Sequence, residues 1–117
     1  MSESPIYLQI SAFIEDQIVD KKLKVDEQVP STNALSKVLK INPATAGKGL
    51  NVLVERHILY KKRGIGMFVT EEARHIIIEK RRETFMEDEL PRLIREAKRL
   101  NISSEDLEQM IRSEYNA

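Results

Sequence analysis

Two helix starts that lie close together constrain the fold of this chain more than any other feature. Ser31, behind Pro30, is a preferred N-cap residue because its hydroxyl can accept a hydrogen bond from a free helix N–H group. Asn42 is a second such residue, and Pro43 suits the first helical position, where the N–H has no partner in any case. Only residues 40–41 separate the end of the first helix from the second cap. So short a connection forces two helices to cross sharply, which is typical of a helix-turn-helix unit.

The second of these helices is predicted to have one apolar and one polar face. Its apolar residues recur at helical spacing and are expected to face the core: Ala46, Leu50, Leu53 and Val54. The opposite face is small, polar or cationic: Ala44, Thr45, Lys48 and Asn51. The free N–H groups and positive dipole of a helix N-terminus suit contact with a phosphate. We expect Thr45 to meet a base edge and Lys48 a phosphate or a guanine.

Two glycines, Gly47 and Gly49, interrupt this helix. Each costs about 1 kcal/mol relative to alanine in a helix interior. Either a binding partner approaches the helix closely, or glycine permits tight packing against another helix, and the sequence leaves both open. An ordinary amphipathic surface helix with Lys48 in water is the remaining interpretation, and it leaves the glycines unexplained.

Two other helices are expected to complete the core. The helix that starts at Ser31 should bury Leu35, Val38 and Leu39. A first helix should run from Pro5 to about Lys22 with an apolar stripe that packs beneath the other two: Ile6, Ile10, Phe13, Ile14 and Ile18.

A basic hairpin is predicted after the second helix of the pair. Residues 58–60 and 67–69 are typical of short strands, and residues 28–29 favour a further short strand against them. Between the two strands, Lys61, Lys62 and Arg63 precede Gly64 and Gly66, whose freedom at positive φ suits a tight turn. Three adjacent cations at a hairpin tip favour a wing that contacts a DNA backbone or minor groove, and a solvated basic hairpin without function is the alternative. A phosphate-binding loop is not indicated, because no GxxxxGK[ST] pattern follows.

The chain beyond residue 70 changes to dense alternating charge. A short heptad pattern is formed by Met86, Leu90, Leu93, Ala97 and Leu100. Pro91 lies inside this pattern, so the helix should kink or restart there. A last helix, capped near Ser103, should bury Leu107, Met110 and Ile111. Two short helices cannot bury these stripes alone, so we expect a homodimer; folding back onto the rest of the chain is the alternative.

Charge is distributed unevenly although the chain has a formal net charge of +0. Residues 37–66 hold seven basic residues against one acidic residue, whereas the segments on either side are each acidic overall. The basic charge therefore lies on the expected recognition helix and wing, which favours double-stranded DNA as the partner.

Four motifs in order resemble the GntR family of bacterial transcription regulators: residues 5–10 (PIYLQI), 30–31 (PS), 41–45 (INPAT) and 63–69 (RGIGMFV). The short two-helix tail and the Asn-Pro-x-Thr helix start are similar to the YtrA subfamily. The resemblance covers the whole chain and implies a winged helix-turn-helix homodimer that represses an operon, often one that includes an ABC transporter. In most of the family, arginines match Asn33, Pro43 and Gly47, and all three are replaced here, so their base contacts cannot be transferred. His57 stands where the family usually has a helix-ending glycine, a left-handed position that histidine tolerates less easily.

Other classes of function find less support in the residues. The chain has two histidines, His57 and His75, and no cysteine, so no zinc-ligand spacing or catalytic triad is present and an enzyme is not expected. The acidic run of residues 87–89 is more typical of a solvated helix face than of a divalent-cation site. A winged-helix module for protein–protein interaction without specific DNA binding is the alternative function, although such a module has no need of the three wing cations. RNA binding lacks an aromatic platform.

The sequence therefore predicts a mainly α fold with a small β-hairpin. Residues 1–70 form a winged helix-turn-helix domain and residues 71–117 a helical dimerisation tail. We expect a cytoplasmic, sequence-specific DNA-binding regulator, a repressor that binds a palindromic operator as a homodimer. It should have no membrane span, no signal peptide at Met1–Pro5, no metal and no cofactor, and any small-molecule effector is unknown. The tail is too small to enclose an effector pocket of ~300 Å³ within one subunit. The DNA-binding residues are predicted to be Ser31, Thr32, Asn33, Asn42, Pro43, Ala44, Thr45, Lys48, Lys61, Lys62, Arg63, Gly64 and Gly66.

Overall fold

The computed structural model describes residues 4–117, and this part of the chain divides into two compact units. One unit reaches to Glu79 and the other spans Lys80–Ala117. The domain boundary expected after residue 70 stays a prediction. The expectation of an N-terminus without a signal peptide falls partly on residues 1–3, which lie outside the described residues. Between residues 4 and 117, no helix is both long enough and apolar enough to cross a bilayer.

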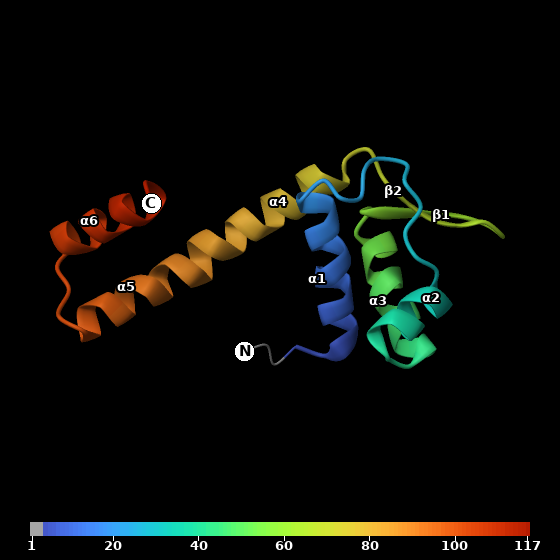
Figure 1. Cartoon of the computed structure of the whole chain (residues 1–117), viewed down its shortest axis with the longest axis horizontal. Helices are drawn as coiled ribbons and strands as arrows, with labels where there is room; N and C mark the ends of the chain where they lie inside the picture. Colours follow the sequence, from blue (N-terminus) through green and yellow to red (C-terminus); the bar gives the residue numbers. More distant parts are fainter. Residues whose placement is uncertain (1–3) are drawn as a thin grey trace. The chain divides into compact units, whose positions relative to one another are not determined.

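The first unit is mainly helical with one two-stranded antiparallel hairpin, which confirms the predicted fold class. Figure 1 shows α1 and α3 side by side, with α2 crossing the beginning of α3 and the hairpin projecting beyond these helices. The elements of this unit before its last helix are α1 (Ile6–Val19), α2 (Thr32–Leu39), α3 (Pro43–Glu55), β1 (Leu59–Lys62) and β2 (Gly66–Val69). The two strands are each longer than predicted, toward the hairpin tip, and α1 ends three residues before the predicted Lys22.

Both predicted N-caps open the helices as expected. The Ser31 hydroxyl accepts from the backbone N–H of Ala34 at 3.0 Å, and Asn42 Oδ1 accepts from that of Ala44 at 2.7 Å. At the end of α2, Lys40 adopts a left-handed φ of 56°, which turns the chain sharply into α3. These three residues make the tight connection that defines the helix-turn-helix.

The core of the first unit lies between α1, α3, the hairpin and the first turns of α4. Its fully buried large side chains are Ile14, Leu35, Leu50, Leu53, Ile58, Leu59, Val69 and Ile77. Three predicted core residues are exposed instead: Val38, at 74%, together with Ile6 and Phe13. The short α2 is fully buried only at Leu35, so Val38 stays at the surface, on the rim of a shallow groove that Phe13 shares.

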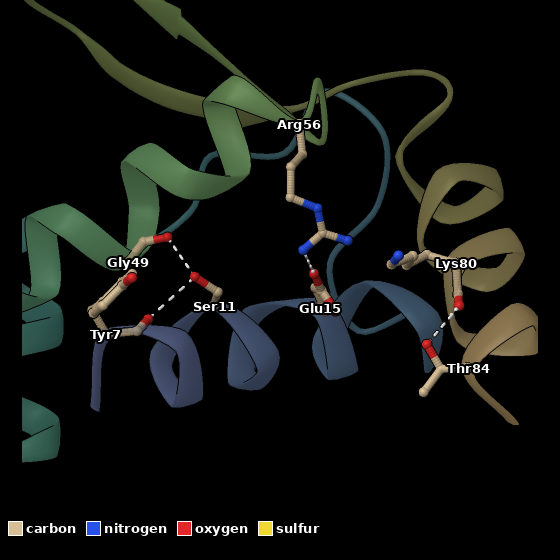
Figure 2. Close-up of polar contacts among 7 residues, drawn as sticks. All are labelled: Tyr7, Ser11, Glu15, Gly49, Arg56, Lys80 and Thr84. Atoms are coloured by element: carbon tan, nitrogen blue, oxygen red, sulfur yellow. Dashed lines mark hydrogen bonds and ion pairs between the residues drawn. The ribbon is translucent and has the colours of Figure 1, made fainter. Parts of the chain in front are cut away.

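Close packing of α1 on α3 depends on Gly49. A Cβ atom at this position would lie 2.7 Å from the carbonyl oxygen of Tyr7 and 3.0 Å from Ile10 Cγ2. The buried Ser11 hydroxyl contacts the carbonyl oxygens of Gly49 at 2.7 Å and of Tyr7 at 3.2 Å (Figure 2). Tight helix packing therefore explains Gly49, whereas a Cβ at Gly47 would meet only Thr32, at an ordinary 3.6 Å.

A second link joins the other ends of α1 and α3. Arg56 Nη1 lies 2.5 Å from Glu15 Oε2, and the Glu15 side chain is only 8% exposed (Figure 2). His57, directly after Arg56, has a φ of 62°, so this histidine does take the left-handed position expected from the resemblance. The chain then turns into β1.

The hairpin pairs Leu59 with Val69 and Lys62 with Gly66. The segment predicted as a third strand forms an isolated bridge instead, from Gln28 to Phe68. The backbone N–H of Val29 donates to the carbonyl oxygen of Met67 at 2.9 Å, so this segment still supports the hairpin along one edge.

Helix α4 (Ala73–Thr84) begins in the first unit, where it buries Ala73 and Ile77 in the core, and its last residues, from Lys80, belong to the second unit. The helical backbone then continues through a π-helical turn, η1 (Phe85–Glu89), into α5 (Leu90–Arg99). The disturbance predicted at Pro91 takes this form: proline lacks the N–H for the α-helical hydrogen bond, and a wider turn precedes it.

The second unit contains little buried apolar surface. Its last helix, α6 (Ser104–Tyr115), is capped by the Ser103 hydroxyl, which accepts from the N–H of Asp106 at 3.1 Å as predicted. Within a single chain Leu107 is half-buried and Met110 and Ile111 are exposed, so their burial in a homodimer stays a prediction. Two short helices offer each other too little surface to cover both stripes.

Candidate nucleic-acid interface

The N-terminus of α3 presents a small polar surface to solvent. Asn42, Pro43 and Ala44 are exposed, and Thr45 is half-buried. Pro43 has no N–H, the Asn42 side chain satisfies that of Ala44, and the N–H of Ala46 donates to the Asn42 carbonyl oxygen at 3.0 Å. The N–H of Thr45 therefore remains in this turn for a ligand. Such an end suits a phosphate or a base edge.

The N-terminus of α2 lies beside α3. Ser31 and Asn33 are exposed, and Thr32 contacts the α3 backbone at Gly47, where a Cβ would lie 3.6 Å from Thr32 Cγ2. The start of α2 is therefore packed against the second turn of α3.

Lys48 lies next to α1. Its Nζ sits 4.1 Å from the centre of the Tyr7 ring, a cation–π contact that fixes the ammonium at the edge of the α3 surface. Lys48 and Asn51 line an open groove of about 520 Å³ with Tyr7. The groove walls carry the Lys48 ammonium and the Asn51 amide, which suit contact with a phosphate, together with the Glu55 carboxylate.

The wing cations Lys61, Lys62 and Arg63 are all exposed. The tip turns between Lys62 and Gly66, and Gly64 has a φ of 76°, which favours glycine. A Cβ at Gly64 would meet no atom within 4 Å, so the backbone there is open to close approach by a ligand.

Aromatic and polar contacts brace the wing behind its tip. The rings of Tyr60 and Phe68 stack with centroids 5.7 Å apart, and Lys62 Nζ lies 4.9 Å from the Phe68 ring centre. The Tyr60 hydroxyl donates to Asp26 Oδ1 at 2.8 Å, and this hydrogen bond is the main reason that the pKa of the Tyr60 phenol is raised. A neutral phenol thus ties the wing to the loop before α2.

Three residues of this surface were missed by the sequence prediction: Tyr7, Gln28 and Ile65. Tyr7 is part of the first-helix motif, but nothing local indicates that its ring meets Lys48. Gln28 Nε2 donates to the carbonyl oxygen of Ile65 at 3.0 Å, a contact between residues 37 apart in sequence. Ile65 could have been noticed in the sequence because it is an apolar residue between two glycines.

The predicted dimerisation residues all belong to the second compact unit. Ala97 is buried, Leu90 and Leu107 are half-buried, and the others are exposed: Met86, Leu93, Leu100, Met110 and Ile111. An open groove of about 290 Å³ between α5 and α6 is lined by several of them. The apolar stripes of both helices thus border one groove.

No group of histidine, aspartate or glutamate residues suited to a metal ion occurs among residues 4–117. The acidic run of residues 87–89 lies in the exposed π-helical turn, where Glu89 Oε1 pairs with Arg92 Nη2 at 2.8 Å.

Comparison with known proteins shows that this chain is similar to bacterial transcriptional regulators. No protein-family model matches the chain. It is 27% identical over 106 residues to the HTH-type transcriptional regulator YhcF of Bacillus subtilis (strain 168), a match that covers 91% of the chain and 86% of YhcF. It is also 27% identical over 111 residues to the HTH-type transcriptional repressor YtrA of the same organism, covering 95% of the chain and 85% of YtrA. A crystal structure of a GntR-family regulator from Bacteroides thetaiotaomicron superimposes with a TM-score of 0.76 at 29% identity, covering 96% of the chain and 97% of that structure. The chain is therefore similar to GntR-family regulators along nearly its whole length.

This similarity confirms the resemblance seen in the sequence and makes this chain a DNA-binding transcriptional regulator. The three arginines expected from the resemblance are absent. Of the residues in their places, Asn33 and Pro43 are exposed near the two helix starts, and Gly47 contacts Thr32.

Proposed function

We propose that this GntR regulator is a repressor that binds a palindromic operator as a homodimer. One observation supports it most: the start of α2 packs against α3 at Gly47, and the same compact unit carries the cationic wing. In each subunit the start of α3 enters the major groove while the wing contacts the flanking backbone or minor groove. YtrA, which matches along most of its length, is named a repressor. A dimer bound at the operator would block the promoter. We expect the protein to act in the cytoplasm and to need no cofactor.

The DNA-contacting residues proposed for this complex are those whose placement is described above. Thr45 offers a hydroxyl and a methyl group to a base edge, and Ser31, Thr32 and Asn33 add short polar groups beside it. Lys48 and the wing cations supply charge for phosphates. The first group sets sequence preference and the second sets affinity.

The homodimer follows from the exposed stripes of the tail. Leu93, Leu100 and Met110 are each about half exposed within one chain, and a second copy would cover them with the same residues by two-fold symmetry. Two-fold symmetry in turn gives two half-sites about one helical turn apart or slightly more. The residues do not identify a small-molecule effector.

The deciding experiment is selection from a random duplex DNA library at near-physiological salt. We expect enrichment of a palindrome, which would also locate the target promoters. Weak, unselective binding would contradict sequence-specific recognition. No binding even at low salt would favour the alternative of a protein-interaction module.

Salt dependence then separates phosphate contacts from base contacts. If the dimer neutralises about eight phosphates, log K should fall against log salt with a slope near −7. Replacing Lys62 and Arg63 together with alanine should weaken binding to every sequence and flatten this slope. The matched control replaces Lys22 and Lys24, exposed cations of the loop after α1, and should change the slope little.

Thr45→Ala tests base readout separately. We expect a changed sequence preference in a repeated selection, with the salt slope kept, because a hydroxyl and methyl are lost but no charge. An unchanged preference would contradict the role proposed for Thr45.

A further inference from the structure

The wing tip carries one apolar side chain among cations. Ile65 is 63% exposed, and Lys61, Lys62 and Arg63 just before it are all exposed cations. A single isoleucine is too small a patch to hold a protein partner. Figure 1 shows the hairpin projecting beyond the helices of its unit, and a solvated basic loop has no need of a β-branched apolar residue in the turn that ends it.

The backbone of this tip is held in one conformation. The N–H of Ile65 donates to the carbonyl oxygen of Lys62 at 2.9 Å, which closes the turn. On its other side, the carbonyl oxygen of Ile65 accepts from Gln28 Nε2 at 3.0 Å. Gly66 makes room for that amide, because a Cβ there would lie 2.4 Å from Gln28 Nε2. Hydrogen bonds on both sides of Ile65 thus fix the direction of its Cα–Cβ bond.

The tip is also narrow. Gly64 has no side chain and open space around it, so next to Ile65 the hairpin is only backbone in width. Lys62 is drawn back over the Phe68 ring, away from the tip. A thin, cation-flanked tip with one projecting apolar group fits the minor groove, which is about 6 Å wide and lined by phosphates.

We propose that Ile65 is a specificity-determining residue that reads the minor groove beside each half-site and favours A·T over G·C pairs there. The proposal rests on the proposed function. A G·C pair places the guanine N2 amino group, a hydrogen-bond donor, on the groove floor, whereas A·T pairs show only acceptors. An isoleucine covers that amino group without accepting from it, so a G·C pair is penalised. Apolar side chains are known in the minor groove, where several DNA-binding proteins insert them between base steps.

Inosine gives a direct test. An inosine·C pair has the major-groove face of G·C but lacks the N2 amino group, so it resembles A·T in the minor groove. Fluorescence anisotropy would measure binding of the full-length protein to duplexes built on the selected sequence, with A·T, G·C or inosine·C pairs scanned through both flanks. For the natural protein we expect G·C at one flank position to weaken binding about tenfold, and inosine·C to restore it.

Variants then assign the effect to Ile65. Ile65→Ser should lose the difference between G·C and inosine·C, whereas Ile65→Val, which keeps the branched apolar group, should retain it. The matched control is Val38→Ser, at an exposed apolar residue of α2, and it should leave the flank profile unchanged. Circular dichroism would confirm that each variant is folded.

The possible failures are distinguishable. Specific binding with equal affinity for G·C and inosine·C at every flank position overturns the role of Ile65 alone. The same conclusion holds if Ile65→Ser keeps the profile of the natural protein. If no sequence is selected at all, the proposed function fails first and the role of Ile65 fails with it.

Discussion

The two compact units of this protein differ in how far each can complete its own core. The unit that ends at Glu79 encloses large apolar side chains such as Leu50, Leu53 and Ile58 almost completely. The unit that begins at Lys80 fully buries only one apolar side chain among its residues, that of Ala97, and leaves Leu93 and Leu100 about half exposed. The first unit is therefore expected to fold as a single chain. The second has the residues of a core but only half of the surface needed to bury them.

This contrast predicts the largest mutational effect. Leu53 is 0% exposed, so replacing it with alanine leaves a cavity in a well-packed core. Leu53→Ala should therefore lower the free energy of unfolding by about 2–5 kcal/mol. Leu93→Ala in the tail removes the same atoms from a side chain that is 46% exposed. Its cost should appear as weaker dimerisation and not as a less stable first unit. Urea unfolding followed by circular dichroism measures the former, and sedimentation equilibrium the latter.

Equal losses of stability in these two variants, with an unchanged dimer constant for Leu93→Ala, would contradict the distinction between the units. That result would show that the tail buries its apolar residues in a core of its own within one chain. A conservative control is Leu93→Met, which keeps the apolar volume and should leave dimerisation nearly unchanged.

Local chemistry made much of the first unit predictable. The N-caps at Ser31, Asn42 and Ser103 were all correct, because a cap depends on residues within one turn of itself. The hairpin was found from its glycines and apolar runs, although each strand extends further toward the tip. The helical periodicity also gave the buried face of α3 correctly, since Ala46, Leu50 and Leu53 are all enclosed.

Tertiary contacts account for what the sequence could not show. Phe13 and Val38 fit an apolar stripe but remain exposed, because no other element of the unit covers that side of α1 and α2. The hydrogen bond from Gln28 to Ile65 joins residues far apart in sequence and carries no local pattern. Gly49 was ambiguous for the same reason, since its neighbour is the backbone of Tyr7.

The close packing of the first unit predicts opposite effects at two glycines of the same helix. Gly49→Ala should destabilise the protein by about 1–3 kcal/mol, because its Cβ would meet a carbonyl oxygen of α1 at 2.7 Å. Gly47→Ala has an ordinary 3.6 Å contact and should be neutral or stabilising by up to about 1 kcal/mol, since alanine favours the helix. Thermal unfolding of both variants measures the difference. A stabilising Gly49→Ala would mean that α1 moves easily on α3, and that the first unit is no more tightly packed than the tail.

Ion pairs offer the mildest comparison between the units. Arg56 meets Glu15 at 2.5 Å, and the glutamate side chain is 8% exposed, whereas Arg92 and Glu89 in the tail are 66% and 54% exposed. Removing one partner of a buried pair leaves a charge that water cannot solvate, but an exposed pair is already solvated. Arg56 is itself 36% exposed, so Arg56→Met should cost only about 1–2 kcal/mol, less than a fully buried pair would. Arg92→Met should cost below about 0.5 kcal/mol.

A double-mutant cycle makes this comparison independent of the lost arginine side chain itself. Adding Glu15→Gln to Arg56→Met should recover part of the stability, because a neutral amide then replaces the carboxylate left without Arg56. The matching cycle with Glu89→Gln and Arg92→Met should give a coupling energy near zero, which salt would reduce further. Urea unfolding at low and high salt measures both cycles. Equal coupling energies in the two pairs would mean that water reaches Glu15 between α1 and α3. The first unit would then exclude solvent less completely than its buried apolar core implies.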